Sequence, residues 1–437
     1  MKKLCKFISV FLLMALLSGC MLTVDQMYCI PKRSETDADL QSSIDKAMSG
    51  MSYSAPLYGE NQQTVQMADL DGDGVNEYLV FAKSAQEEKP LRILVFKNVD
   101  GEFVNTDTVV CNGTAFEQVE YTDMDGNGSV EILIGRQLSD QLIRSVTVYT
   151  FESGRLLQLN SVNYTKFLTA DLNADSYPEL FILRPGQTDT DNGVAELYKM
   201  NDGSIERYNE VTMSQPVDML KRILVGKLSG GETAVYVAST VDEVSLVTDV
   251  FALKDSHLAN ISLLDKSHTS VQTLRNFYIY ADDIDDDSVV ELPRLVYMKP
   301  VEDVSIEKNN HLICWYTMSI QGDESTKMYT YHDFVGGWYM QLMPDWAERT
   351  SVVARNNVFD FYVWNSSQTQ YSKVMSIVAL SGQDAAESTE GYIPLYKTDM
   401  VTYAAVLSEN AKSYGLDEQN VKNSFHLIQQ EWKTGEV

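Results

Sequence analysis

The residues best suited to chemistry in this sequence are acidic side chains in a nine-residue loop that recurs along the chain. Loop 1 runs from Asp69 to Glu77, loop 2 from Asp123 to Glu131, loop 3 from Asp171 to Glu179 and loop 5 from Asp283 to Glu291. Oxygen atoms at positions 1, 3, 5 and 9, with the backbone carbonyl of position 7, form the kind of ligand set that calcium prefers. The predicted calcium ligands, in chain order, are Asp69, Asp71, Asp73, Val75, Glu77, Asp123, Asp125, Asn127, Ser129, Glu131, Asp171, Asn173, Asp175, Tyr177, Glu179, Asp283, Asp285, Asp287, Val289 and Glu291.

The loops differ in the ligands that they offer. Loops 1 and 5 carry four carboxylates each, whereas Asn127 replaces an aspartate at position 5 of loop 2. Loop 3 has Asn173 at position 3, and Ala174 and Ser176 stand where loops 1 and 2 have glycine. We therefore expect loop 3 to bind calcium most weakly. Acidic turns that bind no ion are the alternative, and this alternative is strongest for loop 3.

The charge of the chain agrees with a concentration of acidic sites. With 34 basic and 62 acidic residues the formal net charge is −28, which makes nucleic acid and anionic membrane surfaces poor partners. The four loops supply 14 carboxylates at their ligand positions, 4, 3, 3 and 4 in order. A generic acidic surface is the alternative explanation, but it does not account for the recurring spacing.

The loops also mark a repeat. Their starts are separated by 54, 48 and 112 residues, so one further unit is expected in the last gap, and residues 226–234 fall in register there without acidic ligand positions. Apolar runs typical of buried strands follow all five positions, at residues 78–82, 132–134, 180–183, 235–238 and 292–297. A second β-rich run broken by a turn follows in each unit, with Asp-Gly in the first and third, Ser-Gly in the second and weaker turns in the last two. The pattern therefore predicts four short strands in roughly 50 residues, as in one blade of a β-propeller.

The loop pattern resembles the calcium loops of VCBS and FG-GAP repeats, which form integrin-α-like propeller blades. The resemblance covers residues 63–334, and it is closer to VCBS because the Phe-Gly and Gly-Ala-Pro elements of FG-GAP repeats are absent. An EF-hand fits poorly, since its last acidic ligand lies at position 12 and helices flank its loop. The resemblance implies a mainly β fold, a calcium-stabilised β-propeller with five recognisable blades and room for seven.

The sequence predicts further segments on both sides of the repeats. Residues 20–36 are expected to form a tether, and residues 37–62 a short helix and lead-in whose apolar stripe contains Leu40, Ile44 and Met48. Residues 335–437 are expected to form a separate, small α+β domain. Its last element is predicted to be a helix from Asp417 to Trp432, because Val421, Phe425 and Ile428 share one helical face with Trp432.

The first residues have the layout of an export signal. Three lysines precede an apolar run at residues 7–17, and Leu17-Ser18-Gly19-Cys20 follows. The segment resembles a bacterial lipoprotein signal peptide with its lipobox. The resemblance implies removal of residues 1–19, lipid such as palmitate on Cys20, and anchoring to the cell membrane on its extracytoplasmic face. An ordinary secretory signal or a short membrane helix is the alternative, although the run is short for a span.

No familiar catalytic motif stands out in the sequence. The histidines are scattered, and nucleophile-elbow, phosphate-loop and dinucleotide patterns are missing. We therefore predict that the chain is not an enzyme. The five tryptophans, Trp315, Trp338, Trp346, Trp364 and Trp432, all lie in the last third, where core packing is favoured over stacking on a sugar or a protein partner.

These observations predict a lipid-anchored calcium-binding propeller at the bacterial cell surface, acting as a binding or adhesion scaffold for a protein or glycan. The alternative is an enzyme, or an accessory subunit of one, acting on cell-envelope or dietary polysaccharide. A third interpretation is an envelope assembly or signalling subunit that docks through residues 335–437.

Overall fold

The fold is described from a computed structural model that places residues 35–85, 87–139, 143–188, 191–263, 270–301, 311–381 and 391–429. The predicted signal, Cys20 and all but the last residues of the predicted tether lie outside these ranges. Within them, none of the helices is long and apolar enough to cross a membrane.

The chain is mainly β, as predicted, and its described strands form six antiparallel sheets. Sheet 1 contains β1 (Ser52–Tyr53), β2 (Val65–Ala68), β3 (Glu77–Lys83), β4 (Leu91–Val99) and β5 (Glu102–Cys111). Sheet 2 contains β6 (Ala115–Thr122), β7 (Glu131–Gln137), β8 (Arg144–Glu152) and β9 (Arg155–Tyr164). Sheet 3 contains β10 (Lys166–Ala170), β11 (Glu179–Arg184), β12 (Val194–Asn201) and β13 (Ser204–Thr212). Sheet 4 contains β14 (Leu220–Lys227), β15 (Thr233–Thr240), β16 (Leu246–Lys254) and β17 (His257–Asn260).

Two further sheets follow. Sheet 5 contains β18 (Leu292–Tyr297), β19 (His311–Met318), β20 (Glu324–Asp333), β21 (Trp338–Gln341) and β27 (Phe425–Leu427). Sheet 6 contains β22 (Thr350–Arg355), β23 (Val358–Trp364), β24 (Tyr371–Ser381), β25 (Ile393–Lys397) and β26 (Val401–Leu407). The described helices are α3 (Glu35–Ala47) and α5 (Glu418–Ser424), with short 3-10 turns at Val217–Met219, Val271–Thr273, Ala347–Arg349 and Ala411–Tyr414.

The sheets pack face to face in chain order. One apolar cluster joins sheets 1 and 2 around Phe81 and Phe116, whose rings meet edge to face at 5.0 Å. Similar clusters join sheets 2 and 3, sheets 3 and 4, sheets 4 and 5, and sheets 5 and 6. Each inner sheet therefore buries both of its faces, which explains why the strands after the loops contain continuous apolar runs instead of alternating apolar and polar residues.

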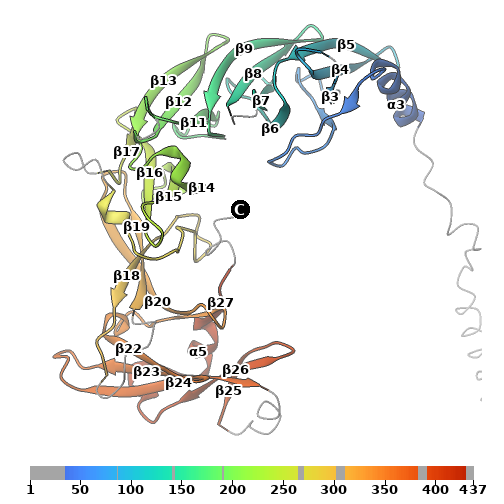
Figure 1. The fold of residues 1–437 in the computed structure, drawn as a ribbon. Coiled ribbons are helices and arrows are strands. Elements are labelled where there is room, and N and C mark those ends of the chain that lie inside the picture. The colour runs from blue at the N-terminus through green and yellow to red at the C-terminus, as the bar shows by residue number, and fades with distance from the viewer. Residues whose placement is uncertain are drawn as a thin grey trace, which may run out of the picture.

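The row of sheets curves into an arc whose two ends stay apart (Figure 1). The predicted units thus correspond to separate sheets, but these sheets do not close into a ring as a propeller would. The physical reason lies at the first sheet, where α3 packs Leu40, Ile44 and Met48 against Val80 and Phe96. The helix covers the face on which a further sheet would have to pack.

The structure corrects the fourth unit. The strand that should precede its loop runs on to Lys227, and the next begins at Thr233, so only residues 228–232 connect them. In loop 1 the corresponding partners are Ala68 and Glu77, with residues 69–76 between them. A connection of five residues instead of eight cannot wrap an ion, which is a stronger reason for a metal-free unit than the missing acidic side chains.

The end of the chain also departs from the prediction. Strand β21 continues sheet 5 beyond the expected boundary at residue 335, since its residues pair with β20. The predicted helix from Asp417 to Trp432 is wrong beyond its first turns, because α5 ends at Ser424 and Phe425–Leu427 pairs with β21 instead. Phe425 is buried as expected, but it is stacked on Trp338 within a sheet, and Trp432 lies outside the described residues.

A register shift recurs in four strand pairs, β4/β5, β8/β9, β12/β13 and β19/β20. It lies next to an aromatic residue of the first strand of each pair, namely Phe96, Tyr149, Tyr198 and Tyr316, and each time the second strand of the pair contains one extra residue. Such bulges increase local twist and redirect the side chain at the insertion. In sheet 5 the inserted residue is Lys327, which becomes important at the metal centres described below.

The covering of sheet 1 by α3 yields a first prediction. Ile44 is 2% exposed at the centre of this contact, so Ile44→Ala should lower the free energy of unfolding by roughly 2–5 kcal/mol. Urea denaturation followed by circular dichroism measures the change. Ser42→Ala, on the exposed side of the same helix, is the matched control and should leave the midpoint unchanged; equal midpoints for both variants would contradict the packing described here.

Candidate metal centres

Each acidic loop is held at its base by a buried glutamate. This glutamate is at most 3% exposed in every loop. It is the first residue of β3 (Glu77), β7 (Glu131) and β11 (Glu179), and in loop 5 it directly precedes β18 (Glu291). In every loop the carboxylate accepts the backbone N–H of position 2, at 3.0 Å from Leu70, 3.0 Å from Met124, 2.9 Å from Leu172 and 3.1 Å from Ile284. The side chain at position 9 therefore fixes the loop to the sheet.

The aspartate at position 1 shapes the rest of the turn. Its carboxylate accepts the N–H of position 6 in all four loops, for example Gly74 to Asp69 at 2.9 Å and Gly128 to Asp123 at 3.0 Å. Positions 4 and 6 have positive φ throughout, which glycine tolerates best. Loop 5, like loop 3, has residues other than glycine at positions 4 and 6, and their backbone is therefore strained: Asp286 and Ser288 have φ of 60° and 71°.

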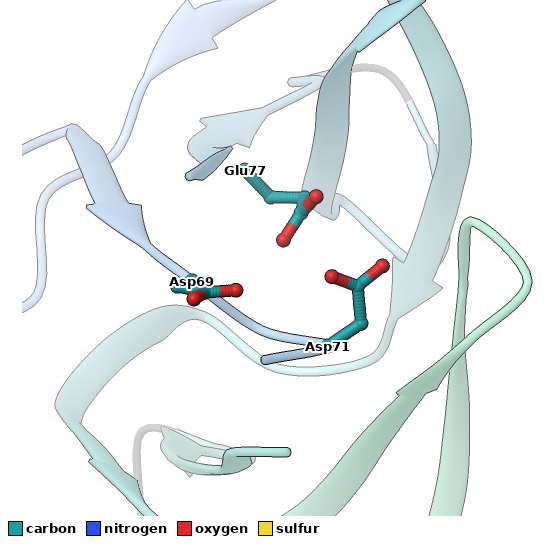
Figure 2. Close-up of side chains that lie close together, drawn as sticks. All are labelled: Asp69, Asp71 and Glu77. Atoms are coloured by element: carbon teal, nitrogen blue, oxygen red, sulfur yellow. The ribbon is translucent and has the colours of Figure 1, made fainter. Parts of the chain in front are cut away.

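This arrangement gathers carboxylate oxygens in three of the four loops. The ligand atoms of Asp69, Asp71 and Glu77 lie within 4.8 Å of one another, and so do those of Asp123, Asp125 and Glu131, and of Asp283, Asp285 and Glu291. Figure 2 shows the carboxylates of loop 1 turned toward a common point. Positions 1, 3 and 9 thus come together as predicted, and these groups could hold a metal ion.

The remaining predicted ligands lie at the margin of these groups. Asp73, Asp175 and Asp287 at position 5 each accept the N–H of position 7, as Asn127 does in loop 2. The position 7 residues are Val75, Ser129, Tyr177 and Val289, and the side chains of Val75 and Tyr177 are exposed. The position 5 oxygens therefore stabilise the turn in addition to any contact with an ion.

Loop 3 is organised differently. The amide of Asn173 at position 3 donates to Asp175 at 2.6 Å and to Glu179 at 2.5 Å. Loops 1, 2 and 5 have an aspartate at this position, so in loop 3 a hydrogen-bond donor takes the place of a carboxylate. Consistent with this, loop 3 is not one of the three acidic groups found within the described part of the chain. The expectation that loop 3 is the weakest site agrees with this geometry.

Several carboxylate oxygens at these centres are buried without a hydrogen-bond partner. They are Asp69 Oδ1 and Asp71 Oδ1 in loop 1 and Glu291 Oε1 in loop 5. Glu77 Oε1 lacks a conventional hydrogen bond but lies 2.9 Å from the ammonium of Lys97, so it is ion-paired. Because a buried, unsatisfied charged oxygen is costly, these atoms fit a cation as their partner.

Burial and neighbouring charge change the protonation of the position 9 glutamates. Burial raises the pKa of Glu131 to about 7, and the negative charges of Asp125 and Asp123 act in the same direction. Burial likewise raises the pKa of Glu291 to about 7. In the absence of a cation these sites therefore favour a bound proton, and a divalent ion would reverse that preference.

Lysines reach two of the three acidic groups, which the sequence analysis missed. Lys97 on β4 lies 2.5 Å from Asp71, 3.0 Å from Asp73 and 2.9 Å from Glu77. Lys327 on β20 pairs with Asp285 and Asp287 of loop 5. In unit 1 the pair Phe96-Lys97 on β4 could have been noticed in the sequence. Lys327 reaches loop 5 from the inserted position of a β-bulge, which the spacing of residues in the sequence does not indicate.

Neighbouring loops touch one another. The N–H of Val130 in loop 2 donates to the carbonyl of Leu70 in loop 1 at 3.0 Å. A Cβ at Gly72 would lie 2.4 Å from the carbonyl oxygen of Gly128, and one at Gly126 would lie 2.3 Å from the ring of Tyr177 in loop 3. Loops 1 to 3 therefore form one continuous edge, and glycine at position 4 allows the close approach in loops 1 and 2.

The four tryptophans in the described part of the chain do not form an open recognition surface. Trp315, Trp338, Trp346 and Trp364 are each at most 5% exposed. Their indole N–H groups mostly find partners, such as Thr330 for Trp315 at 2.8 Å. The preference for core packing is confirmed for these four.

Neither protein-family models nor curated protein sequences match this chain. Among solved structures, the exotype rhamnogalacturonan lyase YesX is 12% identical over 82% of this chain and 72% of its own, with a TM-score of 0.31. A protein from Lactobacillus plantarum is 10% identical over 73% of this chain and 86% of its own, with a TM-score of 0.29. The Bacillus licheniformis rhamnogalacturonan lyase PL11 is 12% identical over 74% of this chain and 72% of its own, with a TM-score of 0.28.

These similarities correct one prediction. The sequence predicted a protein that is not an enzyme, yet two of the three structures just named are lyases. The lack of a familiar catalytic motif therefore does not separate this chain from enzymes, and the exclusion of catalysis is withdrawn. At these identities and TM-scores the similarities assign no activity or substrate to this chain, and the VCBS and FG-GAP resemblance stays a prediction.

The contact between loops 2 and 3 yields a second prediction, with a matched pair of variants. Gly126 and Gly128 both have positive φ, but only a Cβ at Gly126 would meet the ring of Tyr177. Gly128→Ala should cost roughly 1–2 kcal/mol of backbone strain, and Gly126→Ala should cost more because Tyr177 must also move. Thermal unfolding of both variants measures the difference. Equal losses would mean that loops 2 and 3 are not in contact.

A third prediction concerns pH in the presence of a chelator. Because the folded-state pKa of Glu131 is raised above its unfolded value, its contribution to stability is full below about pH 4.5 and is lost as the pH rises through about 7. The melting temperature should therefore fall between about pH 5 and pH 8, and less so in Glu131→Gln. Glu152→Gln, an exposed site on β8, is the control; parallel curves for wild type and Glu131→Gln would contradict the assignment.

Proposed function

We propose that the protein is a calcium-stabilised repeat scaffold that binds a protein or glycan partner at the bacterial cell surface. The observation that carries the metal assignment is the convergence of three carboxylates in each of loops 1, 2 and 5. Loops 1 and 5 also have buried carboxylate oxygens without a hydrogen-bond partner. This donor set consists of oxygen atoms alone, within hairpins that can adjust their shape. Such sites suit calcium better than zinc, which favours nitrogen and sulfur, or magnesium, which demands a rigid octahedron.

The repeat architecture supports a propeller-like scaffold of the VCBS type. An acidic hairpin joins β2 to β3 in sheet 1, β6 to β7 in sheet 2 and β10 to β11 in sheet 3, and a fourth acidic hairpin directly precedes β18 in sheet 5. Neighbouring sheets share apolar cores, as blades do. In this proposal calcium fixes the edge where loops meet, and the stiffened row of sheets presents side chains to a partner.

The location follows from the N-terminal sequence. Cleavage before Cys20 and lipid on its sulfur would hold the sheets outside the cytoplasmic membrane, where calcium reaches the millimolar range that extracellular modules use, about 10⁻³ M. The strong negative charge supports a neutral glycan or a protein as partner rather than a polyanion. The second interpretation, action on polysaccharide, is tested by the same binding experiment described below.

A fourth prediction tests the metal. Adding about 1 mM calcium to chelator-treated protein should raise the melting temperature by a few degrees, since each site with a dissociation constant of about 10⁻⁴ to 10⁻³ M contributes about 0.4–1.4 kcal/mol at that concentration and the contributions of the three sites add. Magnesium at equal concentration should give a much smaller rise. Asp123→Asn should reduce the calcium effect and Asp171→Asn, the corresponding change in loop 3, should reduce it less. A melting temperature indifferent to calcium would overturn the proposal.

The binding role is tested with the full-length chain on glycan arrays and on polysaccharides from bacterial envelopes and plants, in calcium and in chelator. The proposal expects retention on a particular glycan, or capture of a particular surface protein, that is lost in chelator. Release of shortened or unsaturated sugar products from a retained polysaccharide would replace the scaffold role with an enzymatic one. Retention that is equal in calcium and chelator would separate binding from the metal centres.

A further inference from the structure

The three acidic groups differ in one respect that their ligand counts do not reveal. In loop 1 the ammonium of Lys97 lies within 3.0 Å of oxygens from Asp71, Asp73 and Glu77. In loop 5 the ammonium of Lys327 contacts Asp285 at 3.0 Å and also Asp287. Loop 2 has no ion pair to a lysine or arginine among the described residues.

The lysine of loop 1 uses the oxygens that a metal would need. Asp71 and Glu77 belong both to the converging acidic group and to the ion pairs of Lys97. An ammonium has three N–H donors, and three carboxylates surround this one, so its bonding capacity is filled. A calcium ion and this ammonium cannot both occupy the centre of the loop.

The positions of the two lysines are fixed by the fold. The side chain of Lys97 is 22% exposed and its ammonium lies 5.9 Å from the centre of the Phe151 ring of sheet 2, so it is held between two sheets. Lys327 is the inserted residue of a bulge that redirects its side chain toward loop 5. Neither contact is a chance encounter of long surface side chains.

We propose that Lys97 and Lys327 act as built-in cations that compete with calcium for loops 1 and 5, so that loop 2 fills first. The inference rests on the proposed calcium function and deepens it. Calcium must displace an ammonium to enter loops 1 and 5, and the apparent affinity falls by the fraction of protein in which the ammonium is already out. Loop 2 pays no such cost, although it has fewer carboxylates than loops 1 and 5.

The loops would then have different roles at different calcium concentrations. Loop 2 keeps its ion at low calcium. Loops 1 and 5 respond in a higher range of concentration, and below it the lysine offsets part of their negative charge. A monovalent cation offers no more charge than the ammonium that it would replace, so the exchange favours divalent ions. Loops 1 and 5 would thus sense external calcium, and loop 2 would serve stability alone.

Isothermal titration of the full-length chain with calcium tests the inference, at about 0.15 M salt to screen remote charges. Wild-type protein should show one tighter and at least two weaker sites. Lys97→Met and Lys327→Met should each tighten one weaker site by tenfold or more, and Asp123→Asn with Glu131→Gln should remove the tighter one. Lys166→Met, which removes a lysine of β10 that has no ion pair to an acidic loop, is the matched control and should change no site.

The outcomes separate this inference from the calcium proposal. Calcium binding in which Lys97→Met and Lys327→Met leave the affinities unchanged, or weaken them, would overturn the competition while preserving calcium binding. No binding to any variant would overturn both. Melting in chelator gives a second readout, because Lys97→Met should lower the melting temperature there and lose that deficit in calcium; a deficit that persists in saturating calcium would mean that Lys97 serves only the fold.

Discussion

The buried glutamate at the base of each acidic hairpin is the interaction on which the structure of these units depends. One oxygen of its carboxylate receives a backbone N–H at position 2, and this bond joins the loop to the first residue of the second strand. In loops 1, 2 and 5 the carboxylate also lies close to the aspartates of positions 1 and 3. A carboxylate placed between an apolar core and two other acids is electrostatically unfavourable unless a cation or proton joins it. The sheet and the metal centre therefore depend on each other.

The repeat units differ in how they balance the negative charge gathered around the buried glutamate. Lys97 offsets part of the charge of loop 1 and Lys327 part of that of loop 5. Loop 3 has the amide of Asn173 in place of an acid, and its Glu179 is paired with Lys199. Loop 2 has no lysine or arginine partner among the described residues, and burial raises the pKa of its Glu131 to about 7, so a proton or an added cation must balance this site. The fourth unit avoids the problem altogether with a shorter connection between β14 and β15. Five copies of one hairpin thus range from an uncompensated acidic site to a plain turn.

Much of the repeat could be predicted because its signals are local. The spacing of Asp69, Asp71 and Glu77 places their oxygens together within one hairpin. A strand buried on both faces, such as β7, carries a continuous apolar run at residues 132–134. The helix at Leu40, Ile44 and Met48 was also found from its own periodicity. What could not be predicted involves contacts between distant segments. Lys327 reaches loop 5 through a bulge, Phe425 joins β21 although its surroundings have helical spacing, and α3 covers the face where a ring would close.

The central claim is that the position 9 glutamates hold calcium together with their neighbouring aspartates. Equilibrium dialysis against radioactive calcium at about 1 mM counts the bound ions directly, free of any assumption about unfolding. The account predicts at least three ions per chain, one for each converging acidic group, and one fewer in Glu131→Gln. A chain that binds no calcium, or a Glu131→Gln variant that binds as many ions as the wild type, would contradict it.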